Sequence, residues 1–499
     1  MYTPTRTAAI QYPDADKDRA SNQYIRRTFL EGTWDGLLAA HGTAQLGPLR
    51  ARLVGEWDIA SNLQKSIAEQ TCTMYDEVPQ VTPAALADLV DAGGYWAIAR
   101  QNQQYVRVCH ENAVYVGWDP DWRVPTYELV PADQITVDTA PYNRTRPVTV
   151  WRAVRRVLDG ELVWTWDRWS VADIPVGAGA SYRIMSNDRR VDLTARFPAE
   201  AEYARARPAV LDEDGRPLLP YVVYHDRGPA SGYWSPACRD REVTFGTLQV
   251  GLLFTAAVHG VLRASWSQRI LSNGRVKGGT TEQIVGTAVR MVTPDPTMIL
   301  QVEGDGVAWG EWGSPLDIEK SERFARIYEA RLAVHYGIPP SDLVIESLNP
   351  ASGASIVVSQ AGKRAIAKRD AVNFRRADTA LFAVTAAIAR AYGVPAAARG
   401  AKARYSGVAL TIEERVRLSP IVIAEIGAGL LDRAEGYAEL HPGMSVEDAT
   451  DAILAATKRE DALEALDPPD PAPVDPAPVA PSDAADPADP PDPADPAES

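Results

Sequence analysis

Residues 314–393 read SPLDIEKSERFARIYEARLAVHYGIPPSDLVIESLNPASGASIVVSQAGKRAIAKRDAVNFRRADTALFAVTAAIARAYG, and this stretch decides the fold. Ser314, Pro315 and Asp317 supply a cap, a first-turn proline and an early carboxylate, a combination typical of a helix start. The predicted helix ends at Gly-Ile-Pro-Pro, residues 337–340, because prolines remove amide donors and disfavour helical geometry in the residue before them. Its apolar stripe consists of Phe324, Ile327, Tyr328 and Leu332.

A loop and a second, longer helix follow the proline stop. The loop, residues 341–353, carries the polar side chains Asp342, Glu346 and Asn349. From residue 354 to 391 there is no proline and the only glycine is Gly362, while Ala, Ile, Val, Arg and Lys dominate. This composition predicts a helix of about ten turns.

The long helix is basic on one side. At 100° per residue Arg364, Lys368 and Arg375 fall within about 40° of one another, and Arg369 and Arg376 form a parallel stripe about 100° away. A solvated face that keeps the helix in water explains the pattern. A surface that meets phosphate explains it too.

Two stretches resemble the portal proteins of tailed bacteriophages. Residues 328–370, YEARLAVHYGIPPSDLVIESLNPASGASIVVSQAGKRAIAKRD, are similar to the family's helix, Gly-[Ile/Val]-Pro stop, variable loop, Ser-Gly-Ala and long Lys/Arg-containing helix. Residues 61–79, SNLQKSIAEQTCTMYDEVP, resemble its early helix with a short Tyr-x-x-x-Pro segment. As an order of elements, the resemblance spans most of the chain.

The resemblance implies an α+β protein that forms a homo-oligomeric ring, a dodecamer in that family, at a unique capsid vertex. Double-stranded DNA would pass through the ring during packaging and ejection, driven by a separate ATPase. The implied partners are the terminase large subunit, the major capsid or scaffolding protein and a head-tail adaptor protein, and the implied location is the virion after synthesis in the host cytoplasm. The implied parts are a wing, helical and then β-rich (1–241), a first stem helix (242–272), a small β-containing clip (273–314), a second stem helix (315–340), a tunnel loop (341–353), a long basic helix beside the tunnel (354–393), a helical crown (394–466) and a disordered acidic tail (467–499).

The resemblance also implies roles for particular residues. Five basic residues are candidates for the DNA channel or the subunit interface, namely Arg364, Lys368, Arg369, Arg375 and Arg376. Asp342, Glu346 and Asn349 are candidates for the tunnel loop.

Composition agrees with a globular chain that has a separate tail. The 499 residues are 45% hydrophobic, which is ample for sizeable cores, and no apolar run is long enough to span a bilayer. Of the net charge of −15, nine negative charges lie in residues 467–499, which also hold twelve prolines and no Lys or Arg. Such a tail is predicted to be extended and disordered, as a solubilising segment, a negative brush or a tether. Three distant cysteines, Cys72, Cys109 and Cys238, are expected to stay reduced.

The N-terminal half is predicted to be helical to about residue 100 and then rich in strands to about residue 223. Residues 105–108 and 113–116 have strand-like patterns, and Asp159-Gly160 between two apolar runs is the strongest hairpin signal. Helical periodicity returns at 242–272. Three tryptophans near the hairpin fit sheet packing, with a substrate platform as the alternative: Trp164, Trp166 and Trp169.

Common enzyme signatures are absent from the sequence. At Gly362-Lys363 the required first glycine of a P-loop is Val357 and the hydroxyl position is Arg364. Neither H-E-x-x-H, G-x-S-x-G nor G-x-G-x-x-G occurs, so we expect no catalysis, cofactor or metal. The alternative to a portal is a soluble enzyme of unrecognised type, with the Trp-rich α+β region as its substrate platform.

Overall fold

The computed structural model describes most of the chain before residue 465. The described residues are 10–47, 57, 62–172, 174–175, 177–200, 208–228, 232–236, 240–265, 268–272, 275–276, 302–303, 308–312, 318–336, 338, 353–405, 412–441, 444 and 446–464. The chain forms two compact units, residues 1–449 and 450–499. In the second unit the described part is helical, and all other elements below belong to the first.

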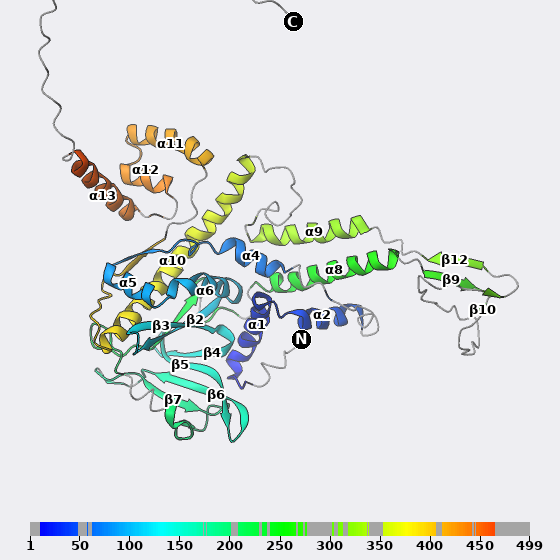
Figure 1. Ribbon diagram of the computed structural model, residues 1–499, viewed down its shortest axis with the longest axis horizontal. Coiled ribbons are helices and arrows are strands. Elements are labelled where there is room, and N and C mark those ends of the chain that lie inside the picture. Colours follow the sequence, from blue (N-terminus) through cyan, green and yellow to red (C-terminus); the bar gives the residue numbers. More distant parts are fainter. Residues whose placement is uncertain are drawn as a thin grey trace, which may run out of the picture. The chain divides into compact units, whose positions relative to one another are not determined.

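The N-terminal part is helical for longer than the sequence indicated (Figure 1). Residues 105–108, expected as a strand, lie in a helix whose buried face includes the polar side chains Asn102 and Gln103. These two residues interrupt the apolar repeat, so the helical period was hidden. The helices are α1 (Asp14–Glu31), α2 (Asp35–Leu46), α4 (Leu63–Thr71), α5 (Ala84–Ala92) and α6 (Tyr95–Cys109).

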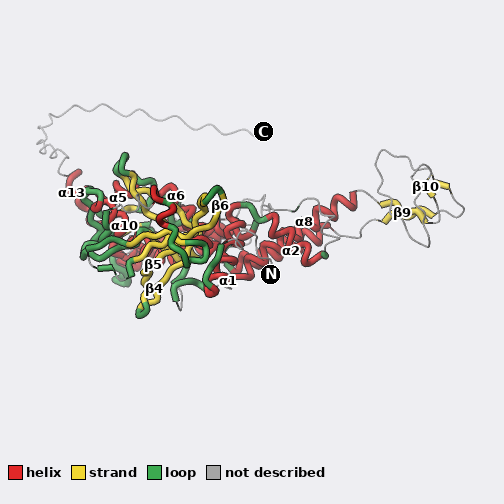
Figure 2. Tube along the Cα trace, turned by 90° about the horizontal axis from the view of Figure 1, so that it is seen from below, coloured by secondary structure: helices red, strands yellow, loops and turns green. Residues whose placement is uncertain are grey.

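Two antiparallel sheets follow, coloured yellow in Figure 2. The predicted hairpin at Asp159-Gly160 is confirmed: both residues have positive φ, and β5 pairs with β6 from Thr149–Ser170 to Leu158–Glu161. The strand expected at 113–116 is confirmed as part of β2. The three-stranded sheet has the order β3 (Val124–Pro131), β2 (Glu111–Asp119), β8 (Tyr221–His225), and the four-stranded sheet has the order β4 (Ile135–Ala140), β5 (Asn143–Leu158), β6 (Glu161–Ser170), β7 (Ser181–Met185), with single 3-10 turns at Ala132–Gln134 and Thr194–Arg196.

A pair of long helices comes next, with short strands between them in the sequence. α8 (Arg241–Ser265) ends earlier than the predicted 272, because β9 (Gln268–Ser272) pairs instead with β12 (Ala308–Trp312). β10 (Arg275–Val276) pairs with β11 (Val302–Glu303), so the described part of the range 273–314 contains short strands, as expected. The helix predicted to begin near Ser314 is confirmed as α9 (Ile318–His335), which packs against α8 (Figure 1).

The long helix expected from residue 354 is confirmed as α10 (Gly353–Ala391), 39 residues without interruption. After it, β13 (Lys402–Arg404) pairs with β1 (Gln80–Thr82), joining segments more than 300 residues apart in the sequence. Residues 394–466 were expected to be helical; residues 402–404 form β13 instead, and most of the other described residues of that range are helical. Its helices are α11 (Ile412–Gly427), α12 (Arg433–Leu440) and α13 (Val446–Glu464).

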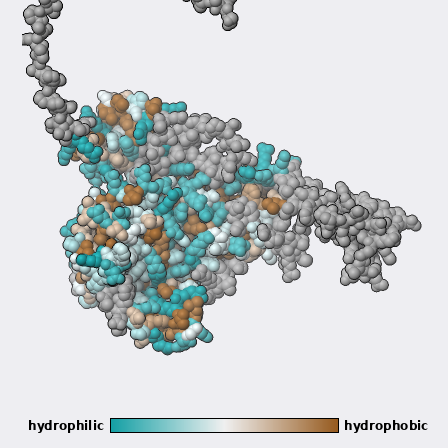
Figure 3. Space-filling view, viewed as in Figure 1, coloured by the Kyte–Doolittle hydropathy of each residue, from teal (hydrophilic) through white to brown (hydrophobic). Residues whose placement is uncertain are grey.

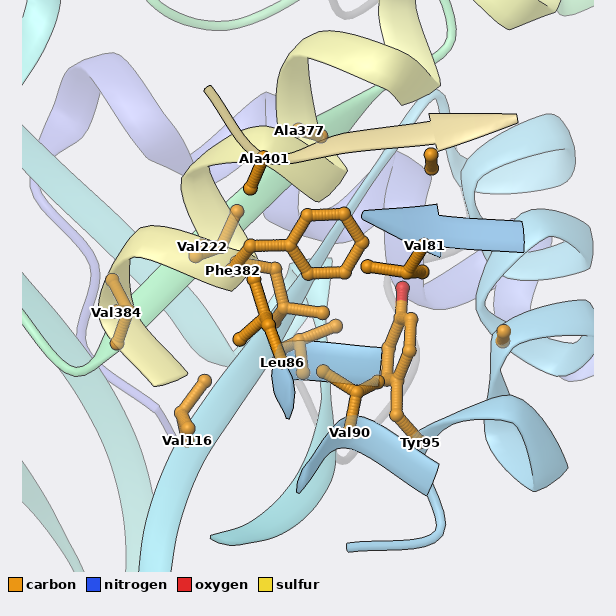
Figure 4. Close-up of a cluster of buried hydrophobic side chains, with 14 of the residues drawn as sticks. Val81, Leu86, Val90, Tyr95, Val116, Val222, Ala377, Phe382, Val384 and Ala401 are labelled. Carbon is orange, nitrogen blue, oxygen red and sulfur yellow. The ribbon is translucent and has the colours of Figure 1, made fainter. Parts of the chain in front are cut away.

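The main core lies where α10 packs on β2, β8 and the helices α5 and α6. Figure 4 shows Phe382 and Val384 of α10 together with Leu86, Val90 and Tyr95 of the N-terminal helices. The C-terminal half of α10 is therefore embedded in the mixed α and β part of the fold. In the part of the chain that the structure describes, no helix is apolar enough over sufficient length to cross a bilayer.

Candidate functional site

The five basic residues of α10 share the side of the helix that faces away from the core. Lys368, Arg369 and Arg376 are exposed, while Arg364 and Arg375 are partly buried. Between the two basic stripes lies Val372, which is 70% exposed. Because α10 is continuous, the stripes stay aligned as the sequence predicted. We call Arg364, Lys368, Arg369, Arg375 and Arg376 the basic face.

One member of the basic face is already paired within its own helix. Both Nε and a terminal nitrogen of Arg369 lie 3.3 Å from Oδ1 of the buried Asp370. Among the described residues, no carboxylate lies within ion-pair distance of Lys368, Arg375 or Arg376. Their charges are therefore available to an anionic partner or a neighbouring molecule.

Beneath the basic face, a buried ion cluster ties α10 to α6 and to the end of β8. The Arg107 guanidinium donates to Asp226 at 2.7 Å and also to Asp370. Asn373 of α10 donates to the Asp226 carbonyl at 2.8 Å. Burial raises the pKa of Asp370 to about 6, although Arg107 pulls it downward. The two carboxylates together raise the pKa of Arg107 above its ordinary value against the opposing effect of burial.

About two turns further along α10 from Asp370, the carboxylate of Asp378 binds four tyrosines. Asp378 is fully buried, and its two oxygens accept from Tyr224 at 2.7 Å, Tyr405 at 2.5 Å, Tyr75 at 2.9 Å and Tyr95 at 3.3 Å. The tyrosines come from β8, the segment after β13, the segment after α4, and α6. We call these five residues the tyrosine cluster. It fixes the position of α10, and hence of the basic face, relative to four other segments.

The α8–α9 pair presents apolar side chains to solvent. The two helices come close at Gly246, where an added Cβ would lie 2.4 Å from Cδ1 of Leu332. Away from that contact, large apolar side chains remain between 44% and 58% exposed: Phe245, Val258, Phe324, Ile327 and Val334. We call Phe324, Ile327 and Val334 the apolar face of α9. Removing large apolar side chains from water is favourable, so covering this surface with another molecule would stabilise it.

The tunnel-loop candidates Asp342, Glu346 and Asn349 lie outside the described residues. The structure therefore does not test them.

The three tryptophans near the hairpin serve the sheet. Trp166 is fully buried and packs on Tyr12, and Trp169 is 9% exposed and packs on Tyr182. Trp164 is partly buried and lies under the guanidinium of Arg155. Sheet packing, the first of the two sequence interpretations, accounts for these contacts.

A cavity of about 610 Å³ lies where Trp169, Trp118, Tyr392 and Arg183 meet. Its acidic residue, Asp192, accepts two hydrogen bonds from Thr194 and lies 3.7 Å from Arg183. The hydrogen bonds from Thr194 lower the pKa of Asp192, so this carboxylate is a poor proton acceptor at neutral pH. In the described ranges, no three His, Cys, Asp or Glu residues gather as a metal site.

Sequence reasoning missed the tyrosine cluster and Arg107. The sequence predicted no role for Asp378, and Arg107 was assigned to a strand. The available signal was the position of Asp370 and Asp378, eight residues apart on α10 and both outside the arc of the basic face. Acidic residues on the apolar side of a long helix indicate buried partners.

Comparison with known proteins finds no matching family model and no matching curated protein. Among solved structures, the chain is similar to one from the virion of a native gene transfer agent particle, with 14% identity, 76% of this chain and 90% of that chain covered, and a TM-score of 0.38. It is also similar to a chain from the neck of the native particle computed with C12 symmetry, with 15% identity, 76% and 89% coverage, and a TM-score of 0.38. A chain from the neck of the empty particle, computed with C6 symmetry, gives 14% identity, 76% and 89% coverage, and a TM-score of 0.37. At these values the likeness assigns neither a fold nor a function to this chain.

Proposed function

We propose that this chain is a portal protein, which forms a ring at a capsid vertex, conducts double-stranded DNA during packaging and ejection, and docks a terminase and head-tail connector proteins. The observation that carries the proposal is the α8–α9 pair with its apolar residues exposed. A helix pair that leaves Phe324, Ile327 and Val334 in water loses the stabilisation that burying them would give, and neighbouring copies of the same pair would cover them.

The order of elements supports the same proposal. A mixed α and β region precedes the helix pair, short paired strands lie between its two helices, and a long basic helix and a helical unit follow. This is the order of wing, stem, clip, tunnel-side helix and crown that the sequence resemblance implies. In the proposed ring, the basic face lies near DNA or against the neighbouring copy.

The ring should contain twelve copies if it follows the family, and its location would be the virion. The proposed partners are the terminase large subunit, the major capsid or scaffolding protein, and a head-tail adaptor protein. The ATPase activity would belong to the motor, because this sequence has no P-loop. The proposed role is therefore structural and not enzymatic.

An enzyme built on the Trp-rich region is the weaker candidate. The cavity beside Trp169 is of ligand size, but Asp192, its carboxylate, is already bound by Thr194 and lies close to Arg183. The Trp166 side chain, expected as part of a platform, is fully buried. Neither residue presents a reactive group to a substrate.

The test is the assembly state of the full chain with one charge added to the apolar face of α9. We expect wild type to form rings with a central hole by negative-stain electron microscopy and light scattering, and Ile327→Glu to remain monomeric. Val157→Glu is the matched control, since Val157 is 65% exposed at the β5–β6 hairpin, and it should leave the rings intact. If wild type stayed monomeric at every protein and salt concentration, and also when mixed with capsid or scaffolding protein, the proposal would be wrong.

A further inference from the structure

α11 and α12 form a small helix pair that buries only one side of α11. Val422 is 2% exposed, and both Val422 and Ile426 approach Gly436 of α12 so closely that a Cβ there would lie 2.6 Å from Cδ1 of Ile426. The chain turns into α12 directly after Leu430, and a capping box of Asp432 and Glu435 starts the second helix. The remaining sides of α11 are left to other partners.

A row of large apolar residues runs along one uncovered side of α11. Val416 and Ile423 are each 66% exposed, and Leu430, just beyond the helix end, is 75% exposed. The three residues are seven positions apart, the spacing at which helices meet along a seam. We call them the stripe. Figure 3 shows apolar surface gathered over α11.

A groove lies beside the stripe, about 100° around the same helix. It has a volume of about 470 Å³ and is lined by Pro420, Ile421, Ala424, Glu425, Ala428 and Leu430. Its floor is small, since Ala424 and Ala428 are one turn apart, and Ile421 forms a wall that is 54% exposed. A row of bulky side chains and a groove with a small-residue floor therefore lie next to each other on one helix.

We propose that the stripe on α11 of one copy packs into the groove on α11 of the next copy, so that this helix pair forms a second interface of the ring. The inference rests on the proposed ring, which brings identical copies side by side. The two contact surfaces share only Leu430, and a contact between unlike surfaces is the kind that can close a ring.

Charge supports a second copy as the occupant. α12 packs on the side of α11 next to the stripe and exposes Glu439, whereas the groove side of α11 exposes Arg417. When the stripe of one copy sits in the groove of another, α12 of the first comes toward Arg417 of the second. Opposite charges then face each other across the contact, which favours this pairing over stripe against stripe.

Cysteine cross-linking tests the pairing directly. We would prepare the full chain as Ile423→Cys, in the stripe, and as Ala428→Cys, in the groove, and oxidise each alone and in a 1:1 mixture, with wild type as the blank for the native cysteines. A disulfide needs Cα atoms about 4.4–6.8 Å apart, so it reports only close neighbours. We expect a cross-linked dimer in the mixture and little in either variant alone.

Two results would overturn the inference. One is efficient cross-linking of Ile423→Cys alone, which means that like surfaces meet. The other is rings without any cross-link in the mixture, which leaves the proposed ring intact and removes this interface. A chain that forms no rings but cross-links in the mixture shows the reverse, because the pairing is then real and the ring proposal fails.

Charge substitutions provide a second measurement. Ile423→Glu and Ile421→Glu should each raise the concentration needed for half assembly by at least about tenfold. A 1:1 mixture should form dimers more readily than either variant alone but not complete rings, because only every second contact joins an intact stripe to an intact groove. Equal assembly of wild type and both variants contradicts the proposal.

Discussion

The hydroxyl of Tyr224 on β8 donates a 2.7 Å hydrogen bond to the carboxylate of Asp378, which is fully buried in the middle of α10. Three further tyrosines complete the shell, namely Tyr75, Tyr95 and Tyr405. Burial raises the pKa of Asp378, while the hydrogen bonds from the phenols lower it. Burial raises the pKa of the four phenols, the same carboxylate raises it further, and the phenols keep their protons to donate.

Replacing Asp378 with Asn should therefore destabilise the fold strongly. An amide nitrogen cannot accept, so two of the four hydroxyls would lose their acceptor while remaining buried. We expect the free energy of unfolding to fall by at least about 2 kcal/mol, measured by urea denaturation. Tyr405→Phe removes one hydrogen bond only and should cost about 1 kcal/mol.

Tyr142→Phe is the control for that series, because Tyr142 is 83% exposed and should tolerate the change. If Asp378→Asn were as stable as wild type, the cluster would not hold α10 in place.

Asp370→Asn should alter how stability depends on pH. The Asp370 pKa rises from 3.8 to about 6 on folding, so between about pH 4 and pH 6 the folded chain retains a proton that the unfolded chain has released. In this window the free energy of unfolding falls as pH rises. The variant removes that contribution, and Asp226 still pairs with Arg107 at 2.7 Å. Urea unfolding at closely spaced pH values measures the change in slope.

The exposed Asp121→Asn is the matched control and should leave the slope unchanged. An unaltered slope in Asp370→Asn would mean that this carboxyl has the same pKa in both states.

His225→Gln should change the slope in the opposite direction. Burial, with Arg376 and Arg19, lowers the pKa of His225 from 6.5 to about 4. The carboxylate of Glu111 lies 4.0 Å from the ring and attracts the cation, but burial outweighs it because Glu111 is itself bonded to Ser235 and Gln23. As pH falls from about 6.5 to 4, His225 becomes protonated in the unfolded chain but stays neutral in the folded chain. The free energy of unfolding of wild type therefore falls, by up to about 3 kcal/mol.

The Gln variant should lose this acid sensitivity while keeping its stability at pH 7. His41→Gln, at a half-buried histidine, serves as the control. Equal acid sensitivity in wild type and His225→Gln would show that another group causes it.

Local signals in the sequence predicted local structure well. Asp159-Gly160 set a hairpin because turn geometry depends on adjacent residues, and helices α9 and α10 followed from residues 314–393 because helical periodicity is also a local pattern. The pairing of Gln80 with Arg404 could not be seen, because no sequence pattern links two strands so far apart. The second half of helix α6 was missed because Asn102 and Gln103 are buried through hydrogen bonds with Asn112 and the Met74 amide, which patterning does not reveal.

The candidate site was predictable to the same extent. Periodicity gave the basic face and its position away from the core. It did not show that Arg369 is bound to Asp370, because that pairing depends on Asp370 being buried beside Arg107. Nor did periodicity show that Asp370 binds an arginine whereas Asp378 binds tyrosines, since these partners come together only in the packed fold.

Replacing Arg364, Lys368 and Arg375 by Ala in one variant should weaken the binding of DNA but should not prevent ring assembly. Each cation that meets a phosphate adds to the salt dependence of binding. For purified rings and a double-stranded DNA fragment, the slope of log affinity against log salt should fall by up to about 3, and packaging should fall with it. The control is Arg144, Arg146 and Arg190 to Ala, three exposed arginines of the sheet region, which should leave both quantities unchanged. Loss of rings in the first variant would instead place the basic face between subunits, because a group that only meets DNA is not needed for assembly.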